Sequence, residues 1–226
     1  MKNDFIVTGS DGFLGAAYVK HLKTLGKKVI GLDFSTPINL DVESEVRSWF
    51  KNNSGNHLVN FFGVNDHISS QKKNVSYLNL PLTMFENIVR TNVISLFSVC
   101  REFIRFNESG TIVNISSIYS LVSPNPSLYS FDEKNIAYGV SKAAVNQLGR
   151  HLAVHAAPKF RINSIILGGI QKNQPTDFIE AYSQLTPLGR MGEPQDLFGM
   201  VDFLSGPTSS YVTGSSITLD GGWTCL

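Results

Sequence analysis

Cysteine, long apolar runs and excess charge are all scarce in this sequence. Of its 226 residues only Cys100 and Cys225 are cysteines, which argues against a disulfide framework and a cysteine-based zinc site. No uninterrupted apolar run approaches the roughly 20 residues that a membrane-spanning helix needs. Because 19 Lys and Arg stand against 18 Asp and Glu, the chain lacks the positive surplus typical of proteins that bind nucleic acid or anionic membranes. We therefore expect no nucleic-acid partner and no membrane association.

Signals for metal binding and for secretion are also weak. His151 and His155 have the i, i+4 spacing of metal ligands, but no carboxylate or cysteine partner accompanies them. We therefore expect no metal, and we interpret this pair as a surface or subunit contact. Residues 1–4 lead directly into apolar residues 5–7, without the longer apolar core and cleavage site of a secretory signal. This start predicts a cytoplasmic protein.

What the sequence does contain is an alternation of strand-like and helix-like segments. Hydrophobic residues make up 42% of the chain, and its length suits one well-buried α/β domain. Short apolar runs predict strands at residues 5–7, 28–33, 38–40, 57–62, 111–116, 161–167 and 216–219. Helical spacing predicts helices at residues 13–25, 42–50, 80–106, 136–157 and 194–204. The alternation predicts a single-domain, Rossmann-like α/β fold, a doubly wound parallel sheet of about seven strands with helices on both faces.

A glycine-rich turn joins the first predicted strand to the first predicted helix. Gly9, Gly12 and Gly15 follow one another at three-residue steps. Glycines let bare backbone approach a pyrophosphate, and the helix N-terminus supplies unpaired N–H groups and a positive dipole. The pattern fits either a dinucleotide-binding turn or an ordinary strand-to-helix turn with packing glycines.

Two aspartates follow at positions that suit an adenosine group. Asp33 ends the second predicted strand, 24 residues after Gly9. Dinucleotide folds place a carboxylate close to this position, where it binds the ribose and repels the 2′-phosphate of NADP. Asp33 therefore favours NAD over NADP, unless it merely caps a loop. Asp41 suits contact with the adenine edge and, almost equally, an N-terminal cap for the next helix.

A tyrosine and a lysine share one face of the predicted helix at residues 136–157. Tyr138 and Lys142 are four residues apart, which is about one turn. A phenol with a pKa near 10 is a poor base at neutral pH, but an adjacent ammonium and a nicotinamide cation both favour phenolate. Tyr138 then suits proton transfer. The same pair is also ordinary on an exposed helix surface, so its place among the other motifs carries the specificity.

Taken together, the motifs resemble the compact branch of the short-chain dehydrogenase/reductase family. The segments that carry the resemblance, in family order, are the glycine turn, Asn60, Asn92 and residues 114–117, 138–142, 161–165, 187–194, 211–214 and 219–223. The last three are the most specific. The resemblance implies one NAD(P)-binding Rossmann domain over residues 1–226, with a substrate loop at about 117–135 and a substrate segment at about 168–190.

The resemblance also implies individual roles. Tyr138 would be the acid/base, and Ser117 would hydrogen-bond the substrate oxygen. Lys142 would bind the nicotinamide ribose and lower the pKa of Tyr138, while Asn92 would hold a water that links Lys142 to solvent. The implied cofactor contacts are Gly9, Asp11, Gly12, Phe13, Leu14, Gly15, Asp33, Asp41, Val42, Asn60, Phe61, Gly63, Tyr138, Lys142, Gly168 and Ile170. The implied reaction is hydride transfer between nicotinamide and a carbinol or carbonyl carbon.

Several positions depart from the family pattern. The usual Asn-Asn-Ala-Gly after the fourth strand is Asn-Phe-Phe-Gly at residues 60–63, and the usual Pro-Gly after the sixth is Leu167-Gly168. The threonine that often follows is not evident at residues 170–173. Residues 34–38 are too few for the usual helix. Ser117 and Tyr138 lie 21 residues apart, which predicts an inserted loop over the reacting carbon.

The inserted loop resembles a narrower group, bacterial oxidoreductases of flagellin modification and of surface-polysaccharide or nonulosonic-acid sugar biosynthesis. This resemblance implies a hydroxyl-rich sugar substrate, phosphorylated or nucleotide-linked. A phosphate could be neutralised by His67, Lys72, Lys73 and Lys172. Solvated surface lysines and a histidine satisfied within a loop explain the same residues at least as well.

Two functions follow from these patterns. The first is an NAD(H)-dependent oxidoreductase that interconverts a secondary alcohol and a ketone on a sugar-derived substrate of bacterial surface-glycan synthesis. The alternative is a catalytically quiet dinucleotide-binding sensor or scaffold, suggested by the bulky residues beside the cofactor site. Joint presence of Asn92, Ser117, Tyr138 and Lys142 favours the enzyme. Resembling proteins pair through the two long helices and the terminal strand, so we expect a homodimer or homotetramer.

Overall fold

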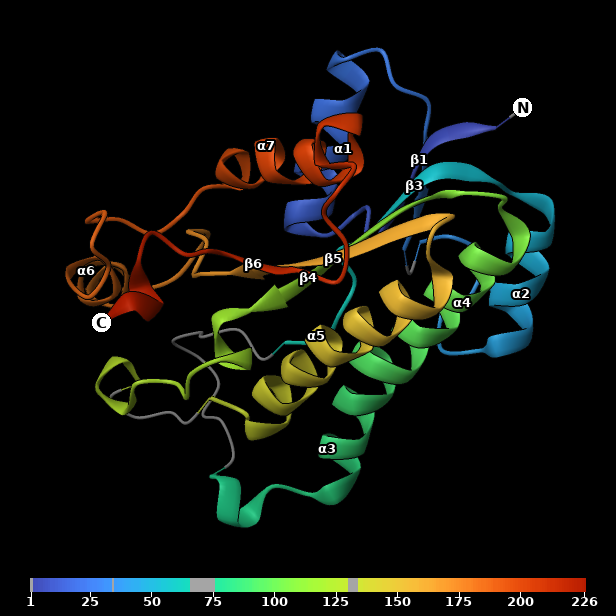
Figure 1. Cartoon of the computed structure of the whole chain (residues 1–226). Coiled ribbons are helices and arrows are strands. Elements are labelled where there is room, and N and C mark those ends of the chain that lie inside the picture. The colour runs from blue at the N-terminus through green and yellow to red at the C-terminus, as the bar shows by residue number, and fades with distance from the viewer. Residues whose placement is uncertain (1, 34, 66–75, 130–133) are drawn as a thin grey trace.

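The computed structural model describes residues 2–33, 35–65, 76–129 and 134–226. Within these ranges the core is a six-stranded parallel sheet in the order β2-β1-β3-β4-β5-β6 (Figure 1). The strands are β1 (Asn3–Thr8), β2 (Val29–Leu32), β3 (Gly55–Asn60), β4 (Gly110–Ser117), β5 (Phe160–Leu167) and β6 (Ser216–Leu219). The single-domain, doubly wound α/β fold predicted from the sequence is confirmed.

The sheet has one strand fewer than predicted, because residues 38–40 form no strand. A parallel neighbour for β2 needs a crossover of about a dozen residues or more, and the linker after Asp33 is far shorter. Ile38 and Leu40 instead pack against the core beneath the sheet, and the backbone N–H of Asn39 donates to Glu45 Oε2 at 2.7 Å. This turn leads directly into helix α2 (Glu43–Asn52), and β2 remains an edge strand.

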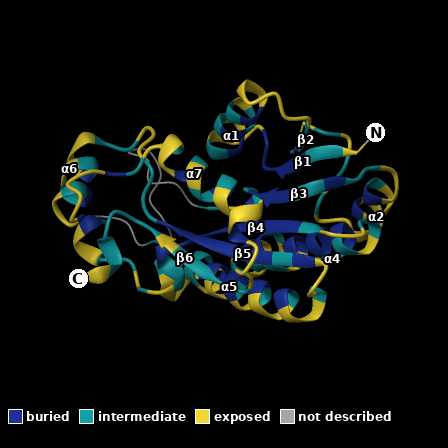
Figure 2. Ribbon diagram, turned by 45° about the horizontal axis from the view of Figure 1, so that its top comes forward, coloured by how far each residue is buried: buried dark blue, intermediate teal, exposed yellow. Residues whose placement is uncertain are grey.

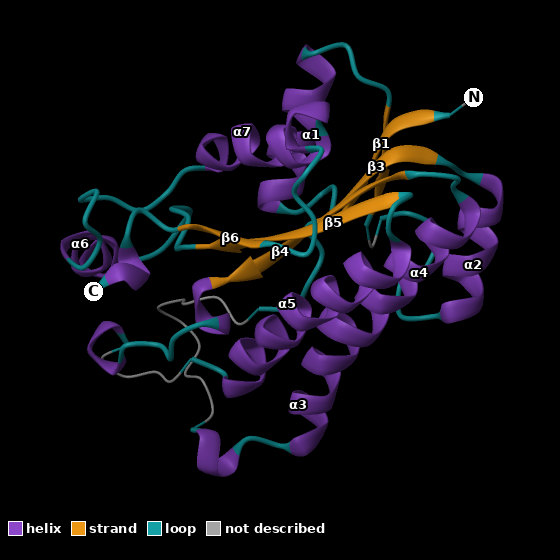
Figure 3. Ribbon diagram, in the orientation of Figure 1, coloured by secondary structure: helices purple, strands orange, loops and turns teal. Residues whose placement is uncertain are grey.

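Helices cover both faces of the sheet (Figures 1 and 3). One face packs against α1 (Phe13–Thr24) and α7 (Pro194–Ser205), and the other packs against α2, α4 (Leu96–Phe106) and α5 (Ile136–Ala156). Strands buried on both sides have near-continuous apolar sequences, as in residues 57–62 and 161–167. Figure 2 shows the central strands buried between these two layers. Among the described residues, no helix is both long enough and apolar enough to cross a membrane.

The long helix predicted at residues 80–106 contains a π-helical segment. Helix α3 (Leu82–Val89) runs through Arg90–Ser95, which is π-helical, into α4. The wider turn buries Asn92 and Ser95, which contact α5 and the linker between β2 and α2, respectively. Single π turns inside α-helices are frequent at functional sites, and this one fixes the position of a predicted site residue.

The carboxyl ends of the strands form the functional edge of the sheet. The chain passes from β1 to β2 on one side of β1, and it then returns to form β3 on the other side. The direction in which successive strands are added to the sheet therefore reverses between β1 and β3. Ligands of doubly wound sheets bind at such a switch point. Beyond the ends of β4 and β5, helix α6 (Thr176–Gln184), which the sequence did not predict, packs its Phe178 and Tyr182 on Ile118 and Leu128 in a third apolar cluster. Its residues Ile118, Phe178 and Tyr182 line the cavity described below.

Candidate active site

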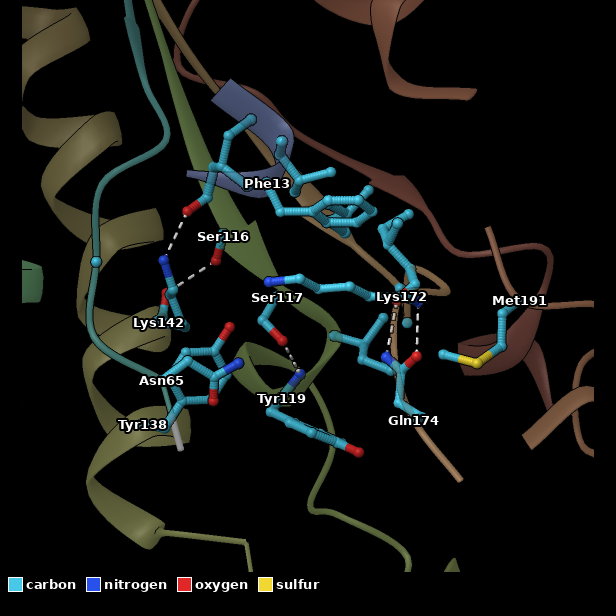
Figure 4. A pocket seen from close by; sticks show the side chains of 18 of the residues that line it. Phe13, Asn65, Ser116, Ser117, Tyr119, Tyr138, Lys142, Lys172, Gln174 and Met191 are labelled. Carbon is cyan, nitrogen blue, oxygen red and sulfur yellow. Dashed lines mark hydrogen bonds between the residues drawn. The ribbon is translucent and has the colours of Figure 1, made fainter. Parts of the chain in front are cut away.

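A cavity of about 640 Å3 opens at this edge of the sheet. Its walls come from the glycine turn after β1, the end of β4, the first turn of α5 and the residues that follow β5, as Figure 4 shows. These segments are far apart in the sequence but meet because parallel strands end at one edge. The predicted substrate loop and substrate segment both border the cavity.

The glycine turn is closed so tightly that side chains are excluded. Gly9 has a φ of +69°, and a Cβ there would lie 2.6 Å from the backbone N of Phe62. A Cβ at Gly15 would lie 2.0 Å from the carbonyl oxygen of Gly9. Helix α1 then begins after Gly12, and no side chain of the described residues caps it. Its first N–H groups are therefore available to an anion in the cavity, which fits the pyrophosphate of a dinucleotide.

Ser117 comes at the start of the predicted substrate loop in the sequence and Tyr138 comes after it, but both side chains line the same cavity (Figure 4). Ser117 ends β4, and its Oγ accepts a hydrogen bond from the backbone N–H of Tyr119 at 3.2 Å. Tyr138 lies in the first turn of α5, which the side chain of Asn135 caps by accepting from the N–H of Ala137 at 3.0 Å. Burial raises the pKa of Tyr138, and a hydrogen bond with Ser117 opposes that rise.

Lys142 lies one turn further along α5. Its ammonium donates to the carbonyl oxygen of Ile115 at 2.9 Å and lies 5.7 Å from the centre of the Tyr138 ring. Burial lowers the pKa of Lys142 to about 8. The sequence predicts a phenol made more acidic by this neighbour, but in the protein alone burial prevails and the pKa of Tyr138 is raised instead.

Asn92 and Gly63 form the wall behind Lys142. Asn92 accepts from the N–H of Val64 at 2.7 Å, and its amide donates to the carbonyl of Val64 and to Ser141 Oγ, both at 3.0 Å. A Cβ at Gly63 would lie 3.0 Å from Asn92 Oδ1 and 3.5 Å from Lys142 Nζ. The absence of a side chain at Gly63 therefore lets the amide and the ammonium approach each other. Asn92 itself does not line the described cavity.

Asp33 and Asp11 meet beside the glycine turn, where the sequence predicts contacts with adenosine. Asp33 Oδ2 accepts from the backbone N–H of Asp11 at 2.8 Å, and Asp11 accepts from the hydroxyl of Ser35. Asp41 does not cap α2, whose N-cap is Val42; it accepts from Ser95 Oγ at 2.5 Å in the π-helical segment instead. The two carboxylates of Asp11 and Asp33 thus lie beside the glycine turn, while Asp41 secures the long helix.

The predicted residues divide into two groups. Those that line the described cavity are Gly9, Gly12, Phe13, Leu14, Gly15, Phe61, Gly63, Ser117, Tyr138, Lys142, Gly168 and Ile170. Those that do not are Asp11, Asp33, Asp41, Val42, Asn60 and Asn92. Asn60 is buried in the sheet, where it accepts from Thr8 Oγ1 at 2.9 Å and donates to Asn114 Oδ1 at 2.8 Å. Asn60 therefore joins the ends of β1 and β3 to the middle of β4 and does not line the cavity.

Comparison with known proteins agrees with this geometry. A family model described as Enoyl-(Acyl carrier protein) reductase matches residues 14–224. The chain belongs to the short-chain dehydrogenase/reductase family. A tropinone reductase homolog from Arabidopsis thaliana is 34% identical over 179 residues, which cover 75% of this chain and 62% of that protein. A galactitol 2-dehydrogenase (L-tagatose-forming) from Cereibacter sphaeroides is 31% identical, over 62% of this chain and 57% of that protein. The chain thus spans roughly three fifths of the length of these curated relatives.

Solved structures of the family show the same fold over nearly the whole chain. A short chain dehydrogenase from Leptospira borgpetersenii with bound NAD+ has a TM-score of 0.86 at 28% identity, covering 99% of this chain and 94% of that one. A putative gluconate dehydrogenase from Agrobacterium tumefaciens has a TM-score of 0.82 at 24% identity, covering 99% and 96%. The second likeness shows the fold alone.

The departures from the family pattern have different structural effects. Phe61 lines the cavity and packs on Tyr18, with ring centres 5.7 Å apart, whereas Phe62 packs into the core on the other face of the sheet. Only one of the two bulky rings of this short-chain dehydrogenase/reductase therefore borders the cavity. Leu167 also lines the cavity. Lys172 lies near the position of the missing threonine, with its ammonium 5.2 Å from the centre of the Phe13 ring.

Two cavity residues were not singled out from the sequence. Lys134 and Asn65 line the cavity and are joined by a hydrogen bond from the Lys134 ammonium to Asn65 Oδ1. They are 69 positions apart and belong to no local motif, so the sequence holds no signal for their pairing.

Three residues named as candidate phosphate ligands, His67, Lys72 and Lys73, lie outside the described residues. The described part of the chain contains no group of three or more His, Cys, Asp and Glu side chains that could hold a metal ion.

Proposed function

We propose that this protein is an NAD(H)-dependent oxidoreductase that interconverts a secondary alcohol and a ketone. The observation that carries the proposal is the convergence of Ser117, Tyr138 and Lys142 on one cavity with the glycine turn. Proton-transfer groups and an anion-binding helix terminus then face the same space. Family membership supports this reaction class.

The protein side chains would transfer one proton and hold the substrate oxygen in place. When bound, the nicotinamide supplies the hydride chemistry, and its oxidised ring brings positive charge. Tyr138 donates its phenolic proton to the carbonyl oxygen in reduction and removes the hydroxyl proton in oxidation. Ser117 donates a hydrogen bond to the same oxygen and holds it in place. Lys142, held by the carbonyl of Ile115, stabilises phenolate when its ammonium is protonated.

NAD fits this protein better than NADP. The Asp33 carboxylate is held by the backbone N–H of Asp11 beside the glycine turn, where we expect the adenosine ribose, so it would repel the 2′-phosphate of NADP. Lys172 lines the cavity with its ammonium 5.2 Å from the centre of the Phe13 ring at the start of α1, where it would add positive charge for a pyrophosphate at the α1 N-terminus. The NAD+ in the Leptospira structure supports the same preference.

A sugar-derived substrate fits the polar walls of the substrate end. Hydroxyl groups of Tyr119 and Tyr129 are joined by a hydrogen bond, and Gln174 and Asn173 also line the cavity. The galactitol 2-dehydrogenase relative supports a polyhydroxylated substrate. We therefore propose a phosphorylated or nucleotide-linked sugar of bacterial surface-polysaccharide synthesis, processed in the cytoplasm.

A homodimer or homotetramer is part of the same proposal. The outer side of the long helices carries large exposed apolar side chains at Leu82, Ile94, Val140 and Val154. Apolar residues of this size gather on surfaces that bury each other in oligomers. Sedimentation equilibrium measures the assembly directly, and a monomer at micromolar concentration would contradict it.

The function is tested with a panel of sugar phosphates, nucleotide sugars, sugar acids and polyols in the presence of NAD(H). Turnover that is lost in Tyr138→Phe, with NADH affinity unchanged, would support the enzyme. Equal rates in both proteins would overturn the role of Tyr138. Tight NADH binding without turnover of any compound would instead favour the sensor or scaffold, which the bulky Phe61 and Leu167 beside the cavity leave as the second candidate.

A further inference from the structure

A buried asparagine follows Tyr138 and Lys142 on the same face of α5. Asn146 lies one turn beyond Lys142 and two turns beyond Tyr138, and only 5% of its surface is exposed. It does not line the cavity, and the proposed chemistry assigns it no role. Its contacts lead instead to the turn that follows β4, directly after Ser117.

Two hydrogen bonds connect Asn146 to the backbone of Ser117. The amide nitrogen of Asn146 donates to Ser120 Oγ at 2.8 Å, and the Ser120 hydroxyl donates to the carbonyl oxygen of Ser117 at 2.6 Å. Ser120 belongs to the short 3-10 turn Ile118–Ser120 at the end of β4. The helix that carries Tyr138 is therefore joined to the residue that carries the second oxygen-binding side chain.

The amide determines the direction of both hydrogen bonds. A serine hydroxyl has one proton to donate, and it accepts through its lone pairs. Because the NH2 group of Asn146 can only donate, Ser120 accepts from it and keeps its own proton for the Ser117 carbonyl. The amide also selects, among the staggered χ1 positions of Ser120, the one in which the hydroxyl reaches that carbonyl.

Packing alone does not favour an amide at position 146. Among the described residues no donor reaches Asn146 Oδ1, and this atom is buried. An unsatisfied buried carbonyl costs about 1–3 kcal/mol, which an apolar side chain of the same shape would avoid. The contribution of Asn146 is therefore the hydrogen bond that its nitrogen donates.

Two further contacts hold α5 against the same strand. Ser116 Oγ donates to the carbonyl oxygen of Lys142 at 3.0 Å, and Lys142 Nζ donates to that of Ile115 at 2.9 Å. Both contacts use β4 residues that precede Ser117. The hydrogen bonds through Ser120 extend this attachment to Ser117 itself.

We propose that Asn146 is a positioning residue that acts through Ser120 to hold Ser117 in place relative to Tyr138. The inference rests on the proposed function, because it takes Ser117 as a donor to the substrate oxygen. Fixing the Ser117 carbonyl restricts the direction of the adjoining side chain toward the phenol on α5. A small displacement of such a group lowers the rate of the reacting complex, while cofactor binding is unaffected.

The test measures kcat with NAD(H) and the compound of the substrate panel that is turned over fastest. Asn146→Ala should lower kcat about tenfold and leave the NADH dissociation constant nearly unchanged. Ser120→Ala, a milder change at a half-buried residue, should cause the same loss. Asn163→Ala is the matched control, because this buried asparagine of β5 donates to the carbonyl of Val212, outside the turn after β4. It should lose stability but keep its kcat.

A double variant separates positioning from general damage. If Asn146 acts through Ser117, adding Asn146→Ala to Ser117→Ala should cost almost no further rate, whereas unrelated losses multiply. A loss in the Ser117→Ala background as large as that in the wild type would overturn the inference and leave the proposed function intact. Unchanged kcat in Asn146→Ala would also overturn it.

Asn146→Asp tests the direction of the hydrogen bonds with little change in shape. A carboxylate only accepts, so the Ser120 hydroxyl would turn toward it and release the Ser117 carbonyl. Burial raises the pKa of such a carboxyl, and its protonated form can donate again. The kcat of this variant should therefore recover, relative to wild type, as the pH falls, whereas that of Asn146→Ala should not. A constant ratio to wild type at all pH values would overturn the inference.

Hydrogen exchange provides a measurement that does not depend on turnover. The N–H groups of Leu121 and Val122 donate to the carbonyl of Ile118 at 2.9 and 3.0 Å, so their exchange reports on the turn that Ser120 closes. Asn146→Ala should accelerate this exchange about tenfold, and Asn163→Ala should leave it unchanged. If no compound is turned over, the proposed function fails, and faster exchange still supports the attachment. Equal exchange in Asn146→Ala and wild type would overturn the inference by itself.

Discussion

Backbone atoms form one end of the cavity, and aromatic side chains form the other. At the cofactor end, Gly9 and Gly15 belong to one turn of seven residues that is closed by contacts between backbone atoms. At the opposite end, rings from separate segments form the wall. Tyr129 lies 5.9 Å from Phe178, and Tyr182 is backed by Trp223, which stacks on it with ring centres 5.8 Å apart. Backbone contacts tolerate almost no substitution, whereas side chains can be exchanged one at a time. The difference explains why a family can keep one cofactor and vary its substrates.

The largest effect is expected where the two ends meet, at the phenol of Tyr138. Tyr138→Phe removes the proton-transfer group and keeps the ring, so kcat should fall by about 10²- to 10⁴-fold. NADH affinity, measured by fluorescence titration, should stay the same because the ring and its packing are retained. A loss of NADH binding as large as the loss of rate would show that Tyr138 serves the cofactor end only.

A single added methyl group should disrupt the glycine turn, because backbone atoms leave no room for it. A Cβ at Gly15 would lie 2.0 Å from the carbonyl of Gly9, so Gly15→Ala should cost about 1–3 kcal/mol of unfolding free energy and weaken NADH binding at least tenfold. Gly199→Ala is the matched control, because this glycine lies within α7 with no atom near its missing Cβ. There the same change should stabilise the protein by roughly 0.5–1 kcal/mol. Chemical denaturation measures both, and equal effects would contradict the tight turn.

The buried ammonium between the two ends should appear in the pH dependence of stability. Burial lowers the pKa of Lys142 from 10.5 to about 8, so between these pH values the unfolded chain binds more protons than the folded one. Stability contributed by this group therefore rises with pH across that window and is flat below it. Lys142→Met should remove a rise of about 1–3 kcal/mol, measured as denaturation midpoints from pH 7 to 10. Identical slopes in the two proteins would show that the ammonium is not desolvated.

Lys172 tests whether a side chain supplements the backbone at the cofactor end. Lys172→Gln should raise the NADH dissociation constant about tenfold, and the effect should shrink at high salt because the interaction is partly exposed. Lys20→Gln, on the exposed side of α1, is the control and should bind NADH like the wild type. Unchanged affinity in Lys172→Gln would mean that the helix N-terminus binds the pyrophosphate alone.

The smallest expected effect is a change of cofactor preference. Asp33→Ser removes one of the two carboxylates at the adenosine end, so the ratio of NADP to NAD affinity should rise about fivefold, with Asp11 still present. Competition between the two cofactors in one titration measures the ratio. If the ratio is unchanged, Asp33 acts only on the Asp11 backbone and the repulsion comes from elsewhere.

The same division explains what the sequence could predict. Local patterns specified the helices at 136–157 and 194–204, the strand at 216–219 and the tight turn around Gly9, because each depends on neighbours within a few residues. The strand at 38–40 was wrong because an apolar triplet fits a loop packed on the core as well as a strand. The length of the linker, rather than its composition, decides between them.

Contacts between distant segments could not be predicted. Nothing in the sequence around Lys134 indicates that its ammonium meets Asn65 and the Tyr138 ring, since those distances depend on how the substrate loop folds. Asn60 shows the reverse case. Its motif correctly marks a position at the end of β3, but its side chain joins strands inside the sheet and does not line the described cavity.

The row formed by Thr8, Asn60 and Asn114 has a consequence for sequence divergence. All three side chains are fully or almost fully buried, and each hydrogen bond crosses from one strand to the next. Replacing one member by an apolar residue leaves its neighbour unsatisfied inside the protein, at a cost of about 1–3 kcal/mol. Substitutions at these three positions should therefore be correlated among homologues. A homologue with an apolar residue at one position should also have apolar residues at the positions that were hydrogen-bonded to it.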